Sequence, residues 1–284
     1  MSTNEATERL SLLMVVAHPH DFTHMAGTCA HHIEDGDSVT VVAITGGGST
    51  HNERLYDELR KRPEDRDEKI LAQQMDQYVD KKMKQFCDAC AIFGITDARV
   101  LPFTDVPLRM SDDMVQILAD LICEVRPHIV MTHAPDHPVN TTISFMDDDH
   151  VEAGRSMRMA MRLAGAPDAA RGRTPHHVVS LFYMGMEFPD QEVNYLVDIT
   201  DQAENRLNAE MLFTTQAHTP EFARKRLDVE VGHRGWNAGT AYAEPFVRAQ
   251  RQVGRKLSIT KHNVDDAEAP RQELLARRSY RVTT

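Results

Sequence analysis

Short runs of β-branched and other apolar residues alternate along the chain with longer segments in which apolar residues recur every three or four positions. Runs of the first kind, bounded by turn-forming residues, are typical of strands buried in a sheet. Segments of the second kind predict amphipathic helices. The predicted strands cover residues 11–17, 38–44, 98–102, 128–133, 177–184 and 194–199.

The predicted helices lie between and beyond these strands. The first covers residues 24–34, and a long polar segment, residues 64–93, stops at Gly94, which is a suitable C-cap. The tail, residues 262–284, lacks strong apolar periodicity and is predicted to be an extended arm. The remaining predicted helices cover residues 111–125, a segment starting near Asp149, residues 201–217 and 219–230, and a segment near 243–254.

Strand and helix units that alternate in this way favour an α/β fold with a mostly parallel, doubly wound sheet and helices on both faces. We expect residues 1–255 to form a single domain and residues 256–284 to form a C-terminal extension or arm. In sheets of this class, ligands bind at the carboxyl ends of the strands. The residues that follow the first, second and fourth predicted strands therefore belong to one rim.

Composition narrows the classes of function. The 284 residues include 43 Asp and Glu but only 32 Lys and Arg, which gives a net charge of -11. This acidic balance disfavours nucleic-acid binding, which needs clustered Lys and Arg. No apolar run approaches the length of a membrane span, and the N-terminus lacks the apolar core of a signal peptide. With four cysteines and no disulfide framework, we expect a cytoplasmic protein.

Histidines and carboxylates gather on the predicted rim. His18 and Asp21 follow the first strand, and an imidazole and a carboxylate in one turn are suitable zinc ligands. A catalytic zinc site keeps an open position beside three protein ligands, so a third is expected from another strand end. A single histidine at a strand end is more often structural, but two clusters on one rim favour a metal site. The segment after the fourth strand offers His133, His137 and His150.

Several segments, in order along the chain, resemble one enzyme family. "AHPHDFTHMAGT" is similar to the "AHPDDE…GGT" signature of the PIG-L/LmbE-like zinc de-N-acetylases, which include deacetylases of the N-acetylglucosaminyl-phosphatidylinositol, mycothiol and bacillithiol pathways. The likeness covers roughly residues 11–250. It implies a Rossmann-like fold and the hydrolysis of an N-acyl group, usually acetyl, on an amino sugar or related small amide. Further segments that resemble the family are "DSVTVVAITGGGS", "ICEVRPHIVMTHAP", "DDDHVEAG" and "AGTAYAEPFVRAQ".

The resemblance implies that His18, Asp21 and His150 are the metal ligands and that each chain holds one zinc ion. Two positions depart from the family pattern. His20 stands where the family has its general-base aspartate, and Asp147 stands where the family has a catalytic histidine. The base and its partner are therefore exchanged between the two motifs, which affects the expected substrate more than the expected metal.

The sequence leaves two assignments of the catalytic groups open. In the first, His20 is the general base, because an imidazole titrates near neutral pH, and Asp147 or Asp149 fixes its tautomer or orients His150. In the second, Asp147 is the base and His20 stabilises the oxyanion. A different class of function also stays open, namely a non-catalytic or differently specialised metal-binding protein of the same fold that acts on a non-sugar amide or C–N bond.

Other residues are candidates for contact with the substrate. Gly47 lies in the loop "TGGGST", where backbone N–H groups can approach an anionic or sugar ligand, and Trp236 is the only tryptophan. His133 and His137 are further candidates. Each residue also has a purely structural interpretation. Gly47 can belong to a flexible loop, Trp236 can be a packed aromatic ring, and the two histidines can be loop residues without a role. A Met-rich helix face, "MRMAMRL", and the long tail favour a homo-oligomer.

Overall fold

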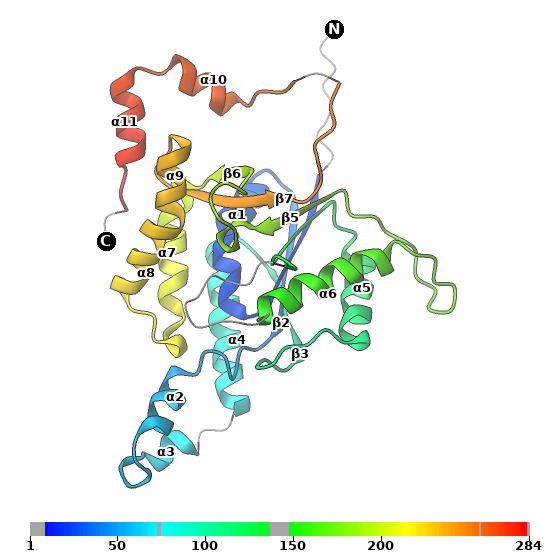
Figure 1. The fold of residues 1–284 in the computed structure, drawn as a ribbon, viewed down its shortest axis with the longest axis vertical. Helices are drawn as coiled ribbons and strands as arrows, with labels where there is room; N and C mark the ends of the chain where they lie inside the picture. The colour runs from blue at the N-terminus through cyan, green and yellow to red at the C-terminus, as the bar shows by residue number, and fades with distance from the viewer. Residues whose placement is uncertain (1–8, 73–74, 137–147, 256, 283–284) are drawn as a thin grey trace.

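The computed structural model describes residues 9–72, 75–136, 148–255 and 257–282, so two candidate site residues, His137 and Asp147, lie outside the described residues. A seven-stranded sheet forms the centre of the molecule, with helices around it (Figure 1). Its strands are β1 (Ser11–Val16), β2 (Ser38–Thr45), β3 (Asp97–Phe103), β4 (Ile129–Thr132), β5 (Ser180–Met184), β6 (Tyr195–Asp198) and β7 (Ala243–Arg248).

The strand order is β3-β2-β1-β4-β5-β7-β6. Strands β1 to β5 pair in parallel, whereas β7 runs antiparallel to both of its neighbours, β5 and β6. The chain winds outward from β1 to β3 and then returns to place β4 on the other side of β1, so the order reverses between β1 and β4. In doubly wound sheets the crevice at such a switch point binds the ligand. The predicted α/β class with a mostly parallel sheet is confirmed. The antiparallel pairing is confined to the edge formed by β7 and β6.

Helices cover both faces of the sheet. The longer ones are α1 (Ala26–Glu34), α2 (Glu53–Arg60), α4 (Met75–Ile92), α5 (Asp112–Val125), α6 (Asp149–Ala164), α7 (Ala203–Leu212), α8 (Pro220–Leu227), α10 (Lys261–Glu268) and α11 (Arg271–Ser279). The shorter ones are α3 (Glu68–Leu71), α9 (His233–Ala238), η1 (Pro19–His24), η2 (Pro63–Asp65), η3 (Gly185–Glu187), η4 (Thr200–Gln202), η5 (Thr214–Gln216) and the π-helical η6 (Asp228–Gly232). None of the described helices is both long enough and apolar enough to cross a membrane.

From Leu12 to Val16, strand β1 is apolar and buried, as expected of a parallel strand that is covered on both faces. Leu12, Met14 and Val16 pack with residues of α1, α4 and α7 on one face. Leu13 and Val15 pack with residues of α5 and α6 on the other face. The two cores fix the end of β1, which is the point where the histidine-rich turn begins.

One predicted helix is a strand, and the tail contains helices that its sequence pattern did not predict. The segment near 243–254, predicted to be a helix, contains β7, which is held as a strand by antiparallel pairing on both sides. The tail, predicted to be an extended arm, contains the helices α10 and α11. Thr260 and Asn263 form a capping box that starts α10, and Val282 is buried in a small core with residues of α7, α8 and η6. Local capping and this distant contact outweigh the weak apolar periodicity.

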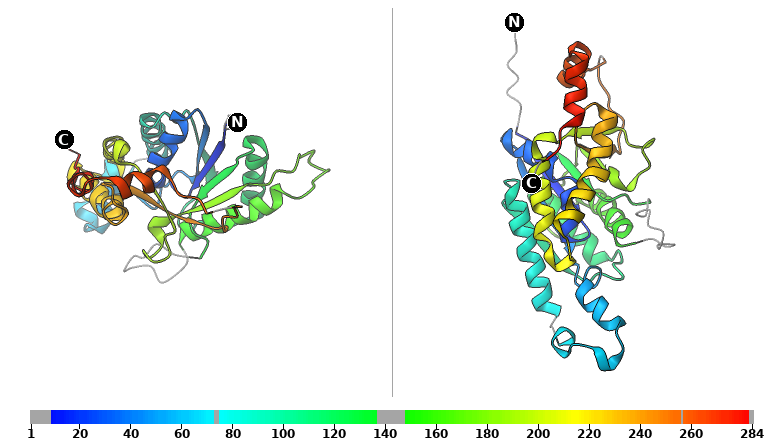
Figure 2. Two further views of the ribbon diagram at one scale, coloured as in Figure 1. Left: turned by 90° about the horizontal axis from the view of Figure 1, so that it is seen from above. Right: turned by 90° about the vertical axis from the view of Figure 1, so that its left-hand side faces the viewer.

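The predicted long helix over residues 64–93 is divided. Its first part forms η2 and α3, and only its second part forms the long helix α4. The Asp67 side chain accepts a hydrogen bond from Lys69 N and so starts α3 as a separate helix. Helices α2 and α3 project at one end of the molecule, and α10 and α11 lie at the opposite end (Figures 1 and 2).

Helix α6 approaches the end of β4 very closely at one glycine. A Cβ atom on Gly154 would lie 2.5 Å from the carbonyl oxygen of His133 and 2.8 Å from the carbonyl carbon of Ala134. Both atoms belong to the backbone, so they cannot rotate away. The absence of a side chain at this position therefore sets how close α6 lies to the switch point of the sheet.

We expect Gly154→Ala to reduce the free energy of unfolding by about 1–3 kcal/mol, because the added methyl group must displace backbone. Denaturant unfolding monitored by circular dichroism measures the change. Gly232→Ala is the matched control, since that glycine is also helical and the nearest atom to its Cβ would lie 3.4 Å away, an ordinary contact. Equal destabilisation of the two variants would contradict the explanation.

Candidate metal centre

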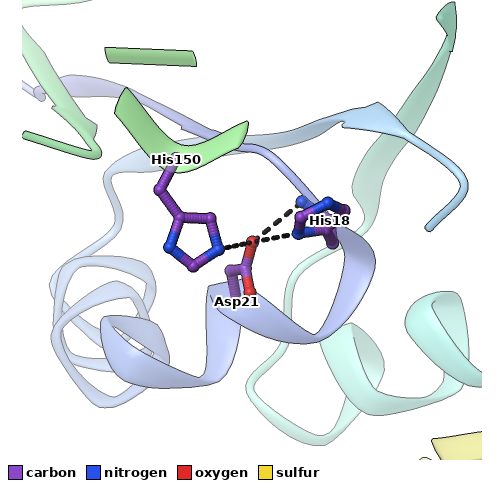
Figure 3. Close-up of side chains that lie close together, drawn as sticks. All are labelled: His18, Asp21 and His150. Atoms are coloured by element: carbon purple, nitrogen blue, oxygen red, sulfur yellow. Dashed lines mark hydrogen bonds and ion pairs between the residues drawn. The ribbon is translucent and has the colours of Figure 1, made fainter. Parts of the chain in front are cut away.

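Three side chains from two distant segments meet at the carboxyl end of β1 (Figure 3). His18 follows the strand directly, Asp21 lies in η1, and His150 lies in the first turn of α6. One nitrogen or oxygen atom from each lies within 4.8 Å of the others. The structure thus brings together the three residues that the sequence resemblance assigned as metal ligands.

The turn after β1 holds the carboxylate in place. His18 is extended, with φ -128° and ψ 158°, and Pro19 starts η1. The backbone N–H of His18 donates to Asp21 Oδ2 at 2.8 Å. The same oxygen lies 3.3 Å from His18 Nδ1 and 3.5 Å from His150 Nε2. Asp21 is therefore the common neighbour of both imidazoles.

These donor atoms fit a divalent metal ion. His18 Nδ1 is buried and has no hydrogen-bond partner among the described residues, although it faces the Asp21 carboxylate. A buried polar atom without a partner is unfavourable, and a cation between imidazole and carboxylate would satisfy both. Two imidazole nitrogens and one carboxylate oxygen match the ligands of catalytic sites that keep a position open for water.

His18 and Asp149 form a charged pair beside the three ligands. His18 Nε2 lies 3.1 Å from Asp149 Oδ2. Burial opposes the charge on His18, but the neighbouring carboxylates of Asp149 and Asp21 outweigh burial and raise the pKa of His18 to about 9. Asp149 thus contacts His18, where the sequence suggested His20 or His150 as its partner. Because a metal must displace the proton of His18, metal affinity should increase as the pH rises.

The loop after β2 supports His18 from the other side. Thr50 Oγ1 lies 3.2 Å from His18 Nε2 and donates to Asp105 Oδ2 at 2.6 Å. Asp105 also accepts hydrogen bonds from the backbone N–H groups of Ser49 and Thr50. The hydrogen bonds to Thr50 and Ser49 outweigh the effect of burial and lower the pKa of Asp105, so this carboxylate is charged and orders the loop.

Gly47, in the same loop, lies directly against a buried lysine. Its φ is +61°, and a Cβ there would lie 2.7 Å from Lys82 Nζ. Lys82 is fully buried and donates to the carbonyl oxygen of Gly47 at 2.6 Å. Burial lowers the pKa of Lys82 to about 8. Lys82 was not predicted from the sequence, because one cation on a strongly polar helix resembles the solvated face of that helix.

His20 lies next to the metal centre without being one of its three candidate ligands. Its Nε2 atom lies 3.2 Å from Asp21 Oδ1, while its Nδ1 atom is buried without a hydrogen-bond partner among the described residues. Its ring packs edge-on against His51, with the ring centroids 4.6 Å apart. Burial lowers the pKa of His20 well below its ordinary value, so the imidazole is neutral near pH 7.

His133, a candidate substrate contact, is instead buried behind the site. It is fully inaccessible to solvent, and its Nε2 atom accepts a hydrogen bond from Ala17 N at 3.0 Å. Its Nδ1 atom lies 2.5 Å from Glu187 Oε1. Glu187, in η3, was not predicted from the sequence. Its position just after a predicted strand, on the same rim, is the signal that could have found it.

A pocket of about 570 Å³ opens over the cluster. It is lined by the three candidate ligands together with His20, Asp149 and Glu187. Val106, Pro107, Met184 and Met186 supply an apolar wall, whereas His24, Arg226 and Glu230 supply a charged one; Thr50, His51 and Asp148 complete the lining. Trp236 is not among these residues. It lies on α9 and is 58% exposed.

The charged side chains of this wall are held by hydrogen bonds and ion pairs. Arg226 donates to Glu210 at 3.0 Å, to Glu230 at 2.9 Å and to His24 Nε2 at 2.8 Å. Glu230 also accepts a hydrogen bond from the fully buried Arg206, at 2.7 Å. Glu230 lies in the π-helical η6, and single π-turns are frequent at functional sites. Arg226 and Glu230 were not predicted from the sequence, because charged residues in a helix resemble its solvated face.

Comparison with known proteins identifies the family. Residues 13–161 match the model of PIG-L, described as GlcNAc-PI de-N-acetylase. The chain belongs to the PIG-L family. It is similar to a 1D-myo-inositol 2-acetamido-2-deoxy-alpha-D-glucopyranoside deacetylase of Catenulispora acidiphila, with 28% identity over 207 residues, which cover 63% of this chain and 62% of that protein. The chain thus spans less than two thirds of the length of the curated PIG-L relatives it matches.

Solved structures share the PIG-L fold seen in this chain. The 4-carboxy-2-hydroxymuconate hydratase of Pseudomonas putida has a TM-score of 0.70 at 22% identity, and the alignment covers 88% of this chain and all of that chain. The N,N'-diacetylchitobiose deacetylase of Pyrococcus horikoshii has a TM-score of 0.67 at 19% identity, with 87% and 86% of the two chains covered. At this identity the likeness shows the fold alone.

We expect His18→Ala to lose the metal, because it removes a ligand of the candidate PIG-L metal centre. Elemental analysis of the purified protein after dialysis against metal-free buffer measures the loss. His31→Ala is the matched control, since that histidine lies on α1, is paired with Asp201 and does not line the pocket. A metal content in His18→Ala equal to that of the control would contradict the assignment.

Proposed function

We propose that this chain is a zinc-dependent hydrolase that removes an N-acyl group, in the first instance an acetyl group, from an amino sugar or a related small amide. The observation that carries the proposal is the cluster of His18, Asp21 and His150 at the base of an open pocket of about 570 Å³. Membership of the PIG-L family and the names of the curated relatives, which are deacetylases of an N-acetylated sugar derivative, support it.

Two imidazoles and one carboxylate favour zinc among the common divalent ions, and the three ligands account for one ion per chain. When bound, zinc polarises the carbonyl group of the substrate and lowers the pKa of a water molecule. The homo-oligomeric state and the cytoplasmic location stay predictions.

In the proposed reaction, His20 accepts the proton of the attacking water and delivers it to the leaving amine. Three observations support this role. His20 lines the pocket, its Nδ1 atom is free of hydrogen bonds to the described residues, and its Nε2 atom is oriented by Asp21 Oδ1 at 3.2 Å. The same carboxylate faces the other two candidate ligands through one oxygen and His20 through the other, which supports a base that acts beside the proposed metal.

The apolar wall of the pocket favours a second candidate within the same chemistry. Val106, Pro107, Met184 and Met186 suit an acyl chain or an aryl group better than a hydroxylated sugar ring. A non-sugar amide is therefore the alternative substrate. The two candidates differ in the leaving group and share the metal centre.

The substrate class can be tested with a panel of N-acetylated amino sugars and N-acyl aryl amides. We expect the zinc-loaded full chain to release the free amine from at least one compound, a chelator to abolish the release, and added zinc to restore it. Release only from aryl amides would favour the second candidate. No release from any compound by fully zinc-loaded protein would contradict the hydrolase proposal.

We expect His20→Ala to keep its zinc but to lose about 10²–10⁴-fold in kcat, the usual contribution of a general base. Zinc content and amine release, measured on the same preparation, separate the two effects. Asp147→Ala is the comparison, because the competing assignment makes Asp147 the base. Near-normal turnover in His20→Ala together with a large loss in Asp147→Ala would reverse the two roles.

A further inference from the structure

Glu187 is a buried carboxylate behind the candidate metal centre, and the proposed reaction gives it no role. It lies in η3, directly after β5, and its side chain is 2% exposed. Two imidazoles converge on its Oε1 atom, His133 Nδ1 at 2.5 Å and His150 Nδ1 at 3.5 Å. Its Oε2 atom accepts a hydrogen bond from Ala134 N at 2.6 Å. Glu187 is thus anchored to the end of β4 and faces the rear of a candidate ligand.

The hydrogen bonds of His133 define its tautomer. The backbone N–H of Ala17 donates to His133 Nε2, so this nitrogen is an acceptor and the ring proton resides on Nδ1. That proton is donated to Glu187. His133 also stacks on His150, with ring centroids 4.2 Å apart and an angle of 15° between the planes. His133 therefore supports the plane of the His150 ring, while Glu187 faces its edge.

The two nitrogens of His150 face different partners. Nε2 lies 3.5 Å from Asp21 Oδ2, on the side of the other candidate ligands. Nδ1 lies 3.5 Å from Glu187 and is a buried atom without a hydrogen-bond partner among the described residues. A histidine that binds a metal through one nitrogen donates the N–H of the other to a carboxylate or carbonyl group, and this bond fixes its orientation.

We propose that Glu187 is a positioning residue of the metal centre, which accepts the Nδ1–H of His150 and so presents Nε2 to the metal. This inference rests on the proposed metal centre and adds a residue to it. His133 completes the arrangement, because it donates to the same carboxylate and holds the His150 ring from one side. A rear support of this kind makes the site more rigid and its ligand more basic.

A second metal site is the alternative, since His133, His150 and Glu187 also place ligand atoms within 4.8 Å of one another. The distances favour the hydrogen bond. His133 Nδ1 lies 2.5 Å from Glu187 Oε1, whereas two ligand atoms bound tetrahedrally at about 2.0 Å from one zinc lie about 3.3 Å apart. His150 would also have to bind two ions through one ring, and counting the zinc ions decides between the alternatives.

The test compares the zinc affinity of wild type, Glu187→Gln and Glu244→Gln, by competition with a chromogenic chelator. We expect Glu187→Gln to bind one zinc per chain with an affinity about 10–100-fold lower, because glutamine cannot accept both imidazole protons as strongly as a carboxylate. Glu244→Gln is the matched control, since Glu244 is a fully buried carboxylate that binds Gly27 and Thr28 and does not line the pocket. We expect its zinc affinity to equal that of wild type. Thermal unfolding of the metal-free proteins verifies that the variants fold.

Equal zinc affinity in wild type and Glu187→Gln would overturn the inference, and so would two zinc ions per wild-type chain with only one in the variant. A second measurement needs no variant at position 187. Long-range ¹H–¹⁵N NMR of the zinc-loaded, ¹⁵N-histidine-labelled wild type is expected to show His150 protonated on Nδ1, and protonation on Nε2 would overturn the inference. Failure of the wild type to bind zinc would instead overturn the proposed function, and the inference with it.

Discussion

The carboxylate of Asp21 is 1% exposed and lies within 3.5 Å of four imidazoles, those of His18, His20, His133 and His150. Burial alone would raise its pKa, but the neighbouring imidazoles outweigh burial and hold the pKa of Asp21 well below its usual range. A buried negative charge is costly unless it is paired and hydrogen-bonded. The geometry of the strand end, of the histidine-rich turn and of α6 depends on satisfying this one charge.

That requirement explains why the packing around the switch point is so close. Two fully covered sheet faces fix the end of β1, and with it the turn that carries Asp21. Gly154 lets α6 approach the backbone of His133 and Ala134, so that His150 can reach the carboxylate. Charges at the periphery, such as Asp105 under Thr50 and Asp149 beside His18, then hold the remaining partners in place. A looser fold would leave a charge buried without partners.

The sequence predicts the parts of this arrangement that depend on local pattern. The strands at the switch point and the helix that starts at Asp149 follow from apolar periodicity and capping, and the three candidate ligands follow from motif resemblance. The strand β7 could not be predicted, because its conformation is imposed by pairing with β5 and β6. Glu187 and Arg226 were missed for a related reason. In the sequence each is an ordinary polar residue. The fold buries Glu187 against the distant His133 and Arg226 against Glu210 of another helix.

The two halves of the chain contribute differently to the candidate site. The family match ends at residue 161, and His18, Asp21 and His150 all lie within it. Part of the pocket wall, namely Met184, Met186, Glu187, Arg226 and Glu230, lies beyond it. A common metal centre can therefore be kept while the later elements change that part of the wall. Because Arg226 already has three partners, a change in this wall would have to alter a whole ionic network, so we infer that the apolar wall is the easier part of the pocket to adapt to a new substrate.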